Sequence, residues 1–297
     1  MNISNIVIVP KMSKYELDMY IYKLTPGELL VKYKQEGVDE KRILESHERQ
    51  KQSLKELKRF FGEKQFVPRD ELTREIAAKA DMVIALGGDN HFQYVSHFLD
   101  NSGLIMGINS DPLRSEGNLI YLTTSDFENV LKKMQQGDFY MERWTRLEVQ
   151  LNGEVLELAT SELFLGEKER KYMSRHILTI RERTEEQKSS GLLVATGAGS
   201  TGWYDSACRY LYPDGNWFSG TAGIARFLVT EPFHGKLSGY SVLEGVLEAG
   251  DELIVRSLND SAGILSIDSL EEYEFNRGAS ASIQISDKPL RVVRVER

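Results

Sequence analysis

The hydrophobic pattern of this chain changes its period near residue 124, and this change limits the folds that the chain can adopt. Before this point, short β-branched runs alternate with stretches whose apolar residues recur at helical spacing. We predict buried strands at Ile6–Val9, Met82–Leu86 and Leu104–Met106, and a long amphipathic helix over 39–61. This alternation predicts a doubly wound, Rossmann-like α/β domain with ligands at the carboxyl ends of its strands.

Capping residues predict where two helices begin. Asp70 is the expected N-cap of a short helix that starts near Leu72. Ser125–Glu128 has the pattern of a capping box for a helix that runs through Met134, and Gly137 is the natural stop of that helix.

Strand signals dominate the rest of the chain. Asn152-Gly153 lies between two alternating apolar runs, the strongest short-range signal for a β-hairpin. Further expected strands are His176–Ile180, Leu192–Ala195, Phe227–Thr230, Glu252–Val255, Ile264–Ile267 and Ala281–Ile285. Many short strands at close spacing predict a β-rich domain, built as a sandwich or irregular sheet. The expected division is an α/β domain at residues 1–123 and a β-rich domain at residues 124–297.

Composition excludes several classes of protein. The 297 residues are enough for about two domains. A net charge of -8 argues against nucleic-acid binding, while glycine turns and a metal ion can still neutralise a polyphosphate ligand. The only cysteine, Cys208, allows no intrachain disulfide and no cysteine-based zinc site. The chain has no membrane-spanning run and no secretory signal in its first residues, so we expect a cytoplasmic protein without membrane partners.

Two glycine-rich turns contain the candidate ligand-binding and catalytic residues. Gly87-Gly88-Asp89 follows an expected strand and precedes an expected helix. Glycine lets backbone N–H groups approach phosphate oxygens, the helix N-terminus favours anions, and the carboxylate can orient or deprotonate a hydroxyl. The alternative is an ordinary strand-to-helix turn capped by Asp89, and this segment alone leaves the two readings evenly matched.

The second turn, Thr196–Tyr204, follows the apolar strand Leu192–Ala195. It offers hydroxyl groups at Ser200 and Thr201, and a flat ring at Trp203. Ligands that combine a sugar, phosphates and a planar base use this mixture of groups. A surface turn with core aromatic residues is the alternative.

These segments resemble those of the NAD kinase family, and of its long, mitochondrial-type members in particular. The matching segments are Gly87-Gly88-Asp89, Gly107-Ile108-Asn109, Asp111-Pro112-Leu113-Arg114-Ser115-Glu116-Gly117, Lys188 to Leu192 and Ala198 to Trp203. The resemblance extends from about Val7 to Pro289.

The resemblance implies ATP- and Mg²⁺-dependent phosphorylation of the adenosine 2′-hydroxyl of NAD. By position, Asp89 would be the catalytic carboxylate, and Gly87, Gly88 and Asn90 would lie at the ATP phosphates. Arg114 is the best cationic candidate for a further phosphate contact near this turn, and a surface arginine in a loop is the alternative. NAD would contact residues of the second domain at Ser161, Glu162, Gly199, Ser200, Thr201, Trp203 and Ser206. No protein metal ligand is assigned. The resemblance also implies a homodimer or homotetramer.

This sequence departs from the family pattern at several of these positions. Asn90 replaces a glycine, and Asn tolerates the left-handed backbone conformation better than most residues. His91 replaces a small polar residue and would crowd or contact the phosphates. Ser161 replaces Asn, and Gly202-Trp203 replaces Ala-Tyr. Two other functions therefore stay open: an NAD(P)-binding sensor without turnover, and a lipid or sphingoid kinase that shares the Gly-Gly-Asp turn. The donor, ATP or polyphosphate, and the acceptor, NAD or NADH, also stay open.

Overall fold

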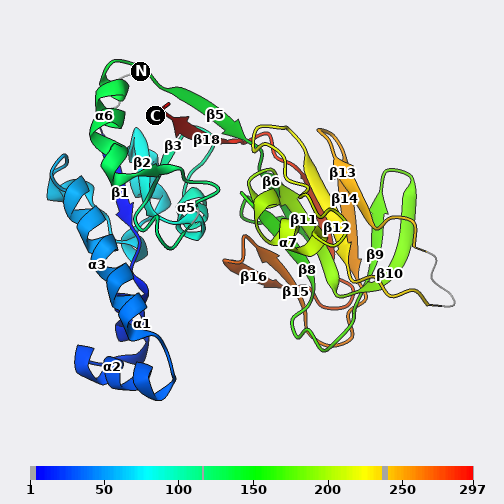
Figure 1. Cartoon of the computed structure of the whole chain (residues 1–297). Helices are drawn as coiled ribbons and strands as arrows, with labels where there is room; N and C mark the ends of the chain where they lie inside the picture. The colour runs from blue at the N-terminus through cyan, green and yellow to red at the C-terminus, as the bar shows by residue number, and fades with distance from the viewer. Residues whose placement is uncertain (1–4, 116, 236–239, 297) are drawn as a thin grey trace. The chain divides into compact units, whose positions relative to one another are not determined.

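The computed structural model describes residues 5–115, 117–235 and 240–296 (Figure 1). Residues 1–4, on which the expected absence of a secretory signal depends, and Glu116 of the Asp111–Gly117 segment lie outside this part of the chain. The structure divides into two compact units, Met1–Met141 with Val292–Arg297, and Glu142–Arg291. Within the described residues, every helix is too short or too polar to traverse a lipid bilayer.

The first unit is built on a six-stranded sheet with the order β1-β2-β3-β18-β5 and with β4 paired to β3. Its strands are β1 (Ile6–Pro10), β2 (Met82–Gly87), β3 (Leu104–Asn109), β4 (Leu122–Thr123), β5 (Tyr140–Trp144) and β18 (Leu290–Arg294). Its helices are α1 (Lys14–Tyr22), α2 (Pro26–Gln35), α3 (Glu40–Leu57), α4 (Arg74–Lys79), α5 (Asp89–Ser96) and α6 (Phe127–Gln135), with 3₁₀ turns η1 (Glu63–Gln65), η2 (Arg69–Glu71) and η3 (Thr124–Asp126).

The register of β1, β2 and β3 sets the position of the first glycine turn. These strands are parallel, with Pro10 opposite Leu86 and Gly87 opposite Asn109. Their carboxyl ends therefore lie at one edge of the sheet, where Lys11, Gly88 and Ser110 follow directly. The three strands predicted in this half of the chain are confirmed, and so is the long helix, as α3.

Both predicted capping arrangements are wrong in detail. Asp70 lies in η2, and Thr73 caps α4 instead, because its side chain accepts the N–H of Ile76. Before α6, the reciprocal capping contacts are made by Thr123 and Asp126 rather than by Ser125–Glu128, since a 3₁₀ turn precedes the helix. Gly137 has the expected left-handed conformation, with φ of 77°.

The second unit contains two six-stranded sheets. One has the order β10-β9-β14-β17-β6-β7, and the other β13-β12-β11-β8-β15-β16. The strands are β6 (Leu147–Leu151), β7 (Glu154–Val155), β8 (Glu162–Glu167), β9 (Ser174–Ile180), β10 (Arg183–Ser189), β11 (Gly191–Thr196), β12 (Ala225–Thr230), β13 (Glu244–Leu247), β14 (Glu252–Ser257), β15 (Gly263–Ile267), β16 (Glu271–Glu274) and β17 (Ser280–Ile285). The six strands predicted here, and the hairpin at Asn152-Gly153, are confirmed.

One core joins the two sheets, so the unit is a β-sandwich. Leu192 and Val194 of β11 belong to that core, whereas Leu193 and Ala195 face the other way and pack with Tyr204 of helix α7 (Trp203–Cys208). Figure 1 shows α7 beside β11 and β12. Coverage on both faces explains why β11 is apolar throughout instead of alternating.

The two units differ in extent from the expected ranges 1–123 and 124–297. Phe127 and Val130 of α6 pack in the core of the first unit, with Ile84 and Met106 of its sheet. Val293 of β18 belongs to the same core. Residues 124–141 and the last strand therefore complete the first unit.

Candidate functional site

A polar cavity of about 420 Å³ lies at the carboxyl edge of the parallel strands in the first unit. Among the residues that line it are Gly88, Asp89, Asn90 and Arg114, four of the five predicted phosphate-site and catalytic residues. The rest of its lining is also polar: Lys11, Lys14, Ser46, Gln50, Asn109, Ser110, Asp111 and Ser115. This composition suits a hydrated, anionic ligand more than an apolar one.

Asp89 is the first residue of α5 and is half-buried. Its carboxylate accepts hydrogen bonds from the backbone N–H groups of Asn118, at 2.9 Å, and Leu119, at 3.2 Å. Burial raises the pKa of Asp89 above its ordinary value, and these N–H groups oppose the rise. A carboxylate fixed in this way is oriented for one partner, and a raised pKa makes it a better proton acceptor.

The two glycines of this turn have different surroundings. A Cβ atom on Gly88 would lie 3.3 Å from Ser115 Oγ at the cavity, whereas a Cβ atom on Gly87 would lie 2.7 Å from the ring of His91. Gly87 is thus required by the His91 side chain, which occupies the space beside it. His91 itself is buried and does not line the cavity, so the expectation that it crowds the phosphates is wrong.

Asn90 needs no left-handed conformation. It is the second residue of α5 and is not among the residues with positive φ. Because a helical position accepts any residue except proline with little strain, the turn keeps its shape with Asn in place of Gly.

Asp111 is held by the long helix α3. Its carboxylate accepts hydrogen bonds from Ser46 Oγ, at 2.6 Å, and from Arg49 Nε, at 2.6 Å. Nearby, Ser53 Oγ donates to the carbonyl oxygen of Ser110 at 2.9 Å. Helix α3 therefore fixes the loop that carries Arg114, and the Asp111 carboxylate is occupied by protein donors rather than available as a metal ligand.

In the second unit, Asp268 organises the start of β8. Its carboxylate accepts the backbone N–H groups of Thr160 and Ser161, each at 2.8 Å, and of Glu162, at 2.9 Å. Asp268 is buried and has a left-handed backbone, with φ of 52°. It acts here as a cap for three successive amides, a role that the sequence alone did not assign.

Ser161 and Glu162 form a buried pair. The Ser161 hydroxyl donates a short hydrogen bond to Glu162 Oε2. Burial raises the pKa of Glu162 to about 7, and the nearby Asp268 carboxylate adds to the rise. Glu162 therefore exchanges its proton near neutral pH, unlike an ordinary glutamate.

The second glycine turn packs directly on this pair. A Cβ atom on Gly199 would lie 2.2 Å from the carbonyl oxygen of Ser161, so only glycine fits there. Ser200 is buried and donates to the carbonyl oxygen of Gly197 at 2.8 Å, while its Oγ accepts the N–H of Phe218 at 3.0 Å. Ser200 thus stabilises the turn, and Thr201, at the end of η4 (Gly199–Thr201), is partly exposed.

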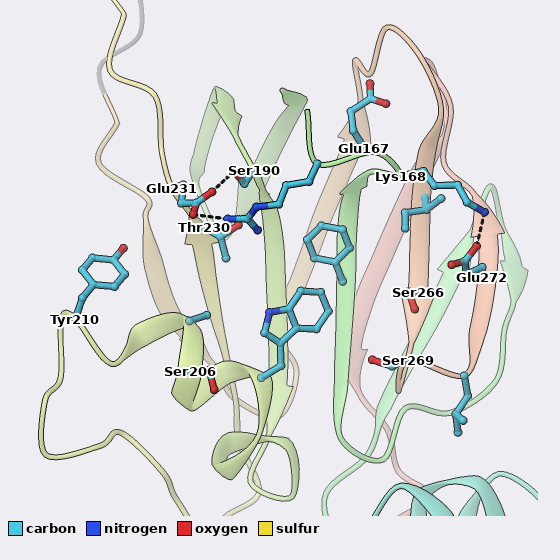
Figure 2. A pocket seen from close by; sticks show the side chains of 16 residues that line it. Glu167, Lys168, Ser190, Ser206, Tyr210, Thr230, Glu231, Ser266, Ser269 and Glu272 are labelled. Atoms are coloured by element: carbon cyan, nitrogen blue, oxygen red, sulfur yellow. Dashed lines mark hydrogen bonds and ion pairs between the residues drawn. The ribbon is translucent and has the colours of Figure 1, made fainter. Parts of the chain in front are cut away.

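Trp203 and Ser206 line a second cavity, of about 780 Å³, within the same unit. The Trp203 ring stacks on Phe164, with centroids 5.0 Å apart and planes 28° from parallel. Figure 2 shows Ser206 and Tyr210 on one side of this cavity and Ser266 and Ser269 on the other. An ion pair of Arg170 with Glu231, at 2.6 Å, lies at its rim. The cavity therefore combines an aromatic wall with hydroxyl groups.

Several residues of these cavities escaped the sequence analysis. Lys11 follows β1, and the rule that ligands lie at the carboxyl ends of strands could have singled it out. Phe164 and Ser269 became recognisable only through the pairing of β8 with β11 and β15. In the described residues, no cluster of three or more His, Cys, Asp or Glu side chains has the arrangement of a metal site.

Comparison with known proteins identifies similar chains. No protein-family model matches the sequence. A protein of Oryza sativa subsp. japonica named probable NADH kinase is 27% identical over 246 residues, which cover 75% of this chain and 73% of that protein. Human NAD kinase 2, mitochondrial, is 28% identical over 254 residues, which cover 67% of this chain and 57% of the human protein.

Comparison of folds also finds an NAD kinase among the similar structures. A crystal structure of an NAD kinase from Archaeoglobus fulgidus in complex with ATP matches with a TM-score of 0.65 at 18% identity, covering 99% of this chain and 94% of that one. This chain is similar to NAD kinases in sequence and in fold. The resemblance stated from the sequence motifs is thereby confirmed, as is an architecture that combines a mixed α/β sheet unit with β-rich sheets.

The structure of this NAD kinase-like chain shows how its departures from the family pattern are accommodated. Asn90 fits a helical position, and His91 fills space beside Gly87. Ser161 keeps a hydrogen bond to Glu162, and Trp203 stacks on Phe164.

Proposed function

We propose that this chain is an NAD kinase, which transfers the terminal phosphoryl group of ATP to the adenosine 2′-hydroxyl of NAD. One observation carries the proposal: Asp89, held by two backbone amides, faces a polar cavity that also contains cationic side chains. Phosphoryl transfer needs mainly positioning and charge neutralisation, together with a group that accepts the proton of the attacking hydroxyl. Asp89 would take that last role.

On the donor side, Gly88, Asn90 and Arg114 would contact the phosphates of ATP. Gly88 brings the backbone close to the cavity, and the N-terminus of α5 favours negative charge. Arg114 is exposed on the loop fixed by α3 and offers a guanidinium group for phosphate oxygens. Gly87 would take part through its backbone only.

The donor set fits a magnesium ion that arrives with the nucleotide. Mg²⁺ keeps several waters and is usually bound through substrate phosphates with one or two carboxylates. Of the two carboxylates that line the cavity, Asp89 would hold it, because Asp111 is already neutralised by the Arg49 guanidinium, whereas Asp89 accepts only backbone N–H groups. Bound there, the ion would offset negative charge on the phosphates.

On the acceptor side, the second unit would hold NAD. Trp203 and Phe164 offer aromatic faces for a planar ring, and Ser206 and Ser269 offer hydroxyl groups. Ser161, Glu162 and Thr201 would contact the dinucleotide, whereas Gly199 and Ser200 would shape the turn from within. Ring stacking of this kind contributes about 0.5 to 1.5 kcal/mol beyond the buried area.

A coupled assay tests the proposal directly. The purified chain is incubated with ATP, Mg²⁺ and either NAD or NADH, and the product is measured with an NADP-specific dehydrogenase. We expect NADP or NADPH to accumulate with the enzyme concentration. Calorimetric binding of NAD without any phosphorylated product would contradict the kinase assignment and favour a dinucleotide-binding protein.

The role of Asp89 is tested by Asp89→Asn. We expect turnover to fall by at least about a hundredfold, since general-base catalysis contributes about 10² to 10⁴, while NAD affinity stays within about tenfold. Asp138→Asn, at an exposed carboxylate that lies 3.9 Å from Lys133, serves as the control and should retain full turnover. Near-normal turnover in Asp89→Asn would show that another group accepts the proton.

We also propose that the protein is a homodimer or homotetramer. Sedimentation equilibrium tests this directly, and a purely monomeric mass at micromolar concentration would exclude it.

A further inference from the structure

Lys11 occupies a special position in the first unit. It follows Pro10 at the end of β1, and its backbone N–H donates to the carbonyl oxygen of Leu86 at 2.8 Å. This bond fixes the start of the loop beside β2, next to the Gly87-Gly88 turn. The exposed side chain of Lys11 lines the same cavity as Asp89 and Arg114.

Another cavity of the first unit, of about 230 Å³, shares Lys11 with the polar cavity that Asp89 lines. It is lined by Lys11, Gln50 and Ser110, which also belong to that polar cavity, by the apolar residues Pro10, Met12, Leu54, Pro68 and Leu86, and by the charged residues Glu16, Lys51, Arg69 and Asp70. Glu16 and Lys51 pair with each other at 2.5 Å. The Oε1 atom of Gln50 is buried with no hydrogen-bond partner. Lys11 is therefore the cation at the junction of a polar and a partly apolar cavity.

The charges around this junction are unbalanced. Lys14 pairs with Asp18 at 2.5 Å, and Asp111 pairs with Arg49. Neither Lys11 nor Arg114 makes an ion pair with a carboxylate of the described residues. Lys11 and Arg114 thus line the polar cavity without an ion-pair partner. Its two carboxylates are Asp89, which accepts backbone N–H groups, and Asp111, which pairs with Arg49 and partly offsets the positive charges around Lys11.

The electrostatic environment of Lys11 favours an anionic ligand. Partial desolvation lowers the pKa of Lys11, and the positive charges of Arg69 and Arg114 lower it further. Arg69 lies over the ring of Tyr94, 3.8 Å from its centroid. Cations held near one another without counter-charges cost free energy, which an anionic ligand recovers on binding. A chain of phosphates, with several negative charges in line, complements this arrangement.

We propose that Lys11 is a phosphate-binding residue for the phosphoryl donor, acting together with Arg114 of the same cavity. The assignment rests on the proposed kinase function for its biological meaning. The binding of phosphates at Lys11 follows from the geometry of the first unit alone. Nothing in the sequence motifs or in the relatives' names assigns this residue a role.

Calorimetry with inorganic tripolyphosphate tests the proposal, because this probe carries phosphates and no base. We expect Lys11→Met to weaken binding about tenfold, the effect of losing one charge-assisted hydrogen bond. Lys11→Arg should stay within about threefold of the wild type, because it keeps the charge. Lys79→Met removes an exposed lysine of the same unit that pairs with Glu75, and should bind normally.

A second measurement uses the wild-type protein and does not depend on how variants fold. Amine acetylation followed by mass spectrometry reports the reactivity of each lysine. Tripolyphosphate should slow the acetylation of Lys11 and leave that of Lys79 unchanged. In kinase assays, Lys11→Met should raise the KM for ATP and leave the KM for NAD unaltered.

The outcomes separate this proposal from the proposed function. Wild-type protein that does not bind tripolyphosphate, or Lys11→Met that binds it normally, would overturn the role of Lys11 even if NADP is formed. Lys11→Arg as weak as Lys11→Met would also overturn it, since charge would then not be the cause. Tripolyphosphate binding that depends on Lys11 in a protein that makes no NADP would support the phosphate site and refute the kinase.

Discussion

The Nε2 atom of His91 lies 2.8 Å from the carbonyl oxygen of Val9. Because a carbonyl oxygen can only accept, Nε2 carries the proton, and the buried Nδ1 atom is left without a hydrogen-bond partner. This bond ties the helix that begins with Asp89 to the strand that ends just before Lys11. One buried imidazole thus sets the spacing of two candidate ligand-binding elements.

Replacing His91 by alanine should destabilise the first unit. The change removes the bond to Val9 and leaves a cavity beside Gly87, which together cost about 2 to 4 kcal/mol. Urea unfolding measures the loss, with His234→Ala at an exposed loop position as the control. A loss below about 0.5 kcal/mol would mean that the contact does not hold β1 and α5 together.

We expect the buried His91 to make the folded state less stable in acid. Burial lowers the pKa of His91 from 6.5 to about 4, so the folded state binds fewer protons than the unfolded state between these values. The contribution of His91 is therefore fully present above pH 6.5 and is lost as the pH falls towards 4, by on the order of 3 kcal/mol. His91→Gln should remove this part of the pH dependence in urea titrations, and an unaltered slope would contradict the prediction.

The contribution of Glu162 to stability has the opposite pH dependence. Its pKa rises on folding to about 7, so its contribution is fully present below about pH 4.5 and is lost as the pH rises through 7. We expect Glu162→Gln to be more stable than the wild type at pH 8, by on the order of 2 to 3 kcal/mol, and equally stable at pH 4. Since the His91 and Glu162 trends partly cancel in the wild type, each variant is compared with the wild type at every pH. A pH-independent difference would argue against a raised pKa.

Arg49→Met should loosen the loop that follows β3. The Asp111 carboxylate would keep only the Ser46 hydroxyl, and we expect a loss of about 1 to 2 kcal/mol in stability. Hydrogen exchange of residues 110–115 should accelerate, and the KM for ATP should rise because Arg114 lies on this loop. Arg42→Met changes an exposed arginine of the same helix and should affect neither quantity. Unchanged exchange would show that α3 does not hold the loop.

Gly199→Ala should damage the second unit. The new methyl group would lie 2.2 Å from the Ser161 carbonyl oxygen, so the turn or the start of β8 must move. We expect about 1 to 3 kcal/mol of destabilisation and weaker NAD binding, measured by thermal unfolding and calorimetry. Gly62→Ala, where the added methyl group meets nothing within 4 Å, is the control. Wild-type NAD affinity in Gly199→Ala would separate this turn from the dinucleotide site.

Much of this architecture was predictable because local patterns and global packing agree. Apolar runs such as Met82–Leu86 are buried on both faces, and Asn152-Gly153 fits the turn of a two-residue hairpin. The Gly-Gly-Asp turn was found because its glycines and carboxylate are adjacent in sequence. The sequence does not predict helices α1 and α2, although Ser13 and Thr25 cap them. In α1, Leu17 and Ile21 are exposed while Asp18 is buried against Tyr33, so no clear apolar face marks the helix.

The parts that escaped prediction depend on distant residues. The sequence predicts that His91 obstructs the phosphates, whereas in the structure its ring bonds to the carbonyl oxygen of Val9, 82 residues away in sequence. The role of Asp268 comes from three amides more than a hundred residues earlier in the chain. Lys11 follows a predicted strand, but the Gly-Gly-Asp turn beside which it lies is more than seventy residues away in sequence. Such pairings are properties of the tertiary structure.

The place of β18 has a consequence for how the protein is made. This strand, Leu290–Arg294, lies between β3 and β5 in the sheet that the first residues begin. During synthesis, that sheet lacks an inner strand until the whole sandwich has emerged from the ribosome. The first unit of the nascent chain therefore has an unpaired sheet edge until β18 is made. If translation stalls before residue 290, that edge stays open and can pair with strands of other chains.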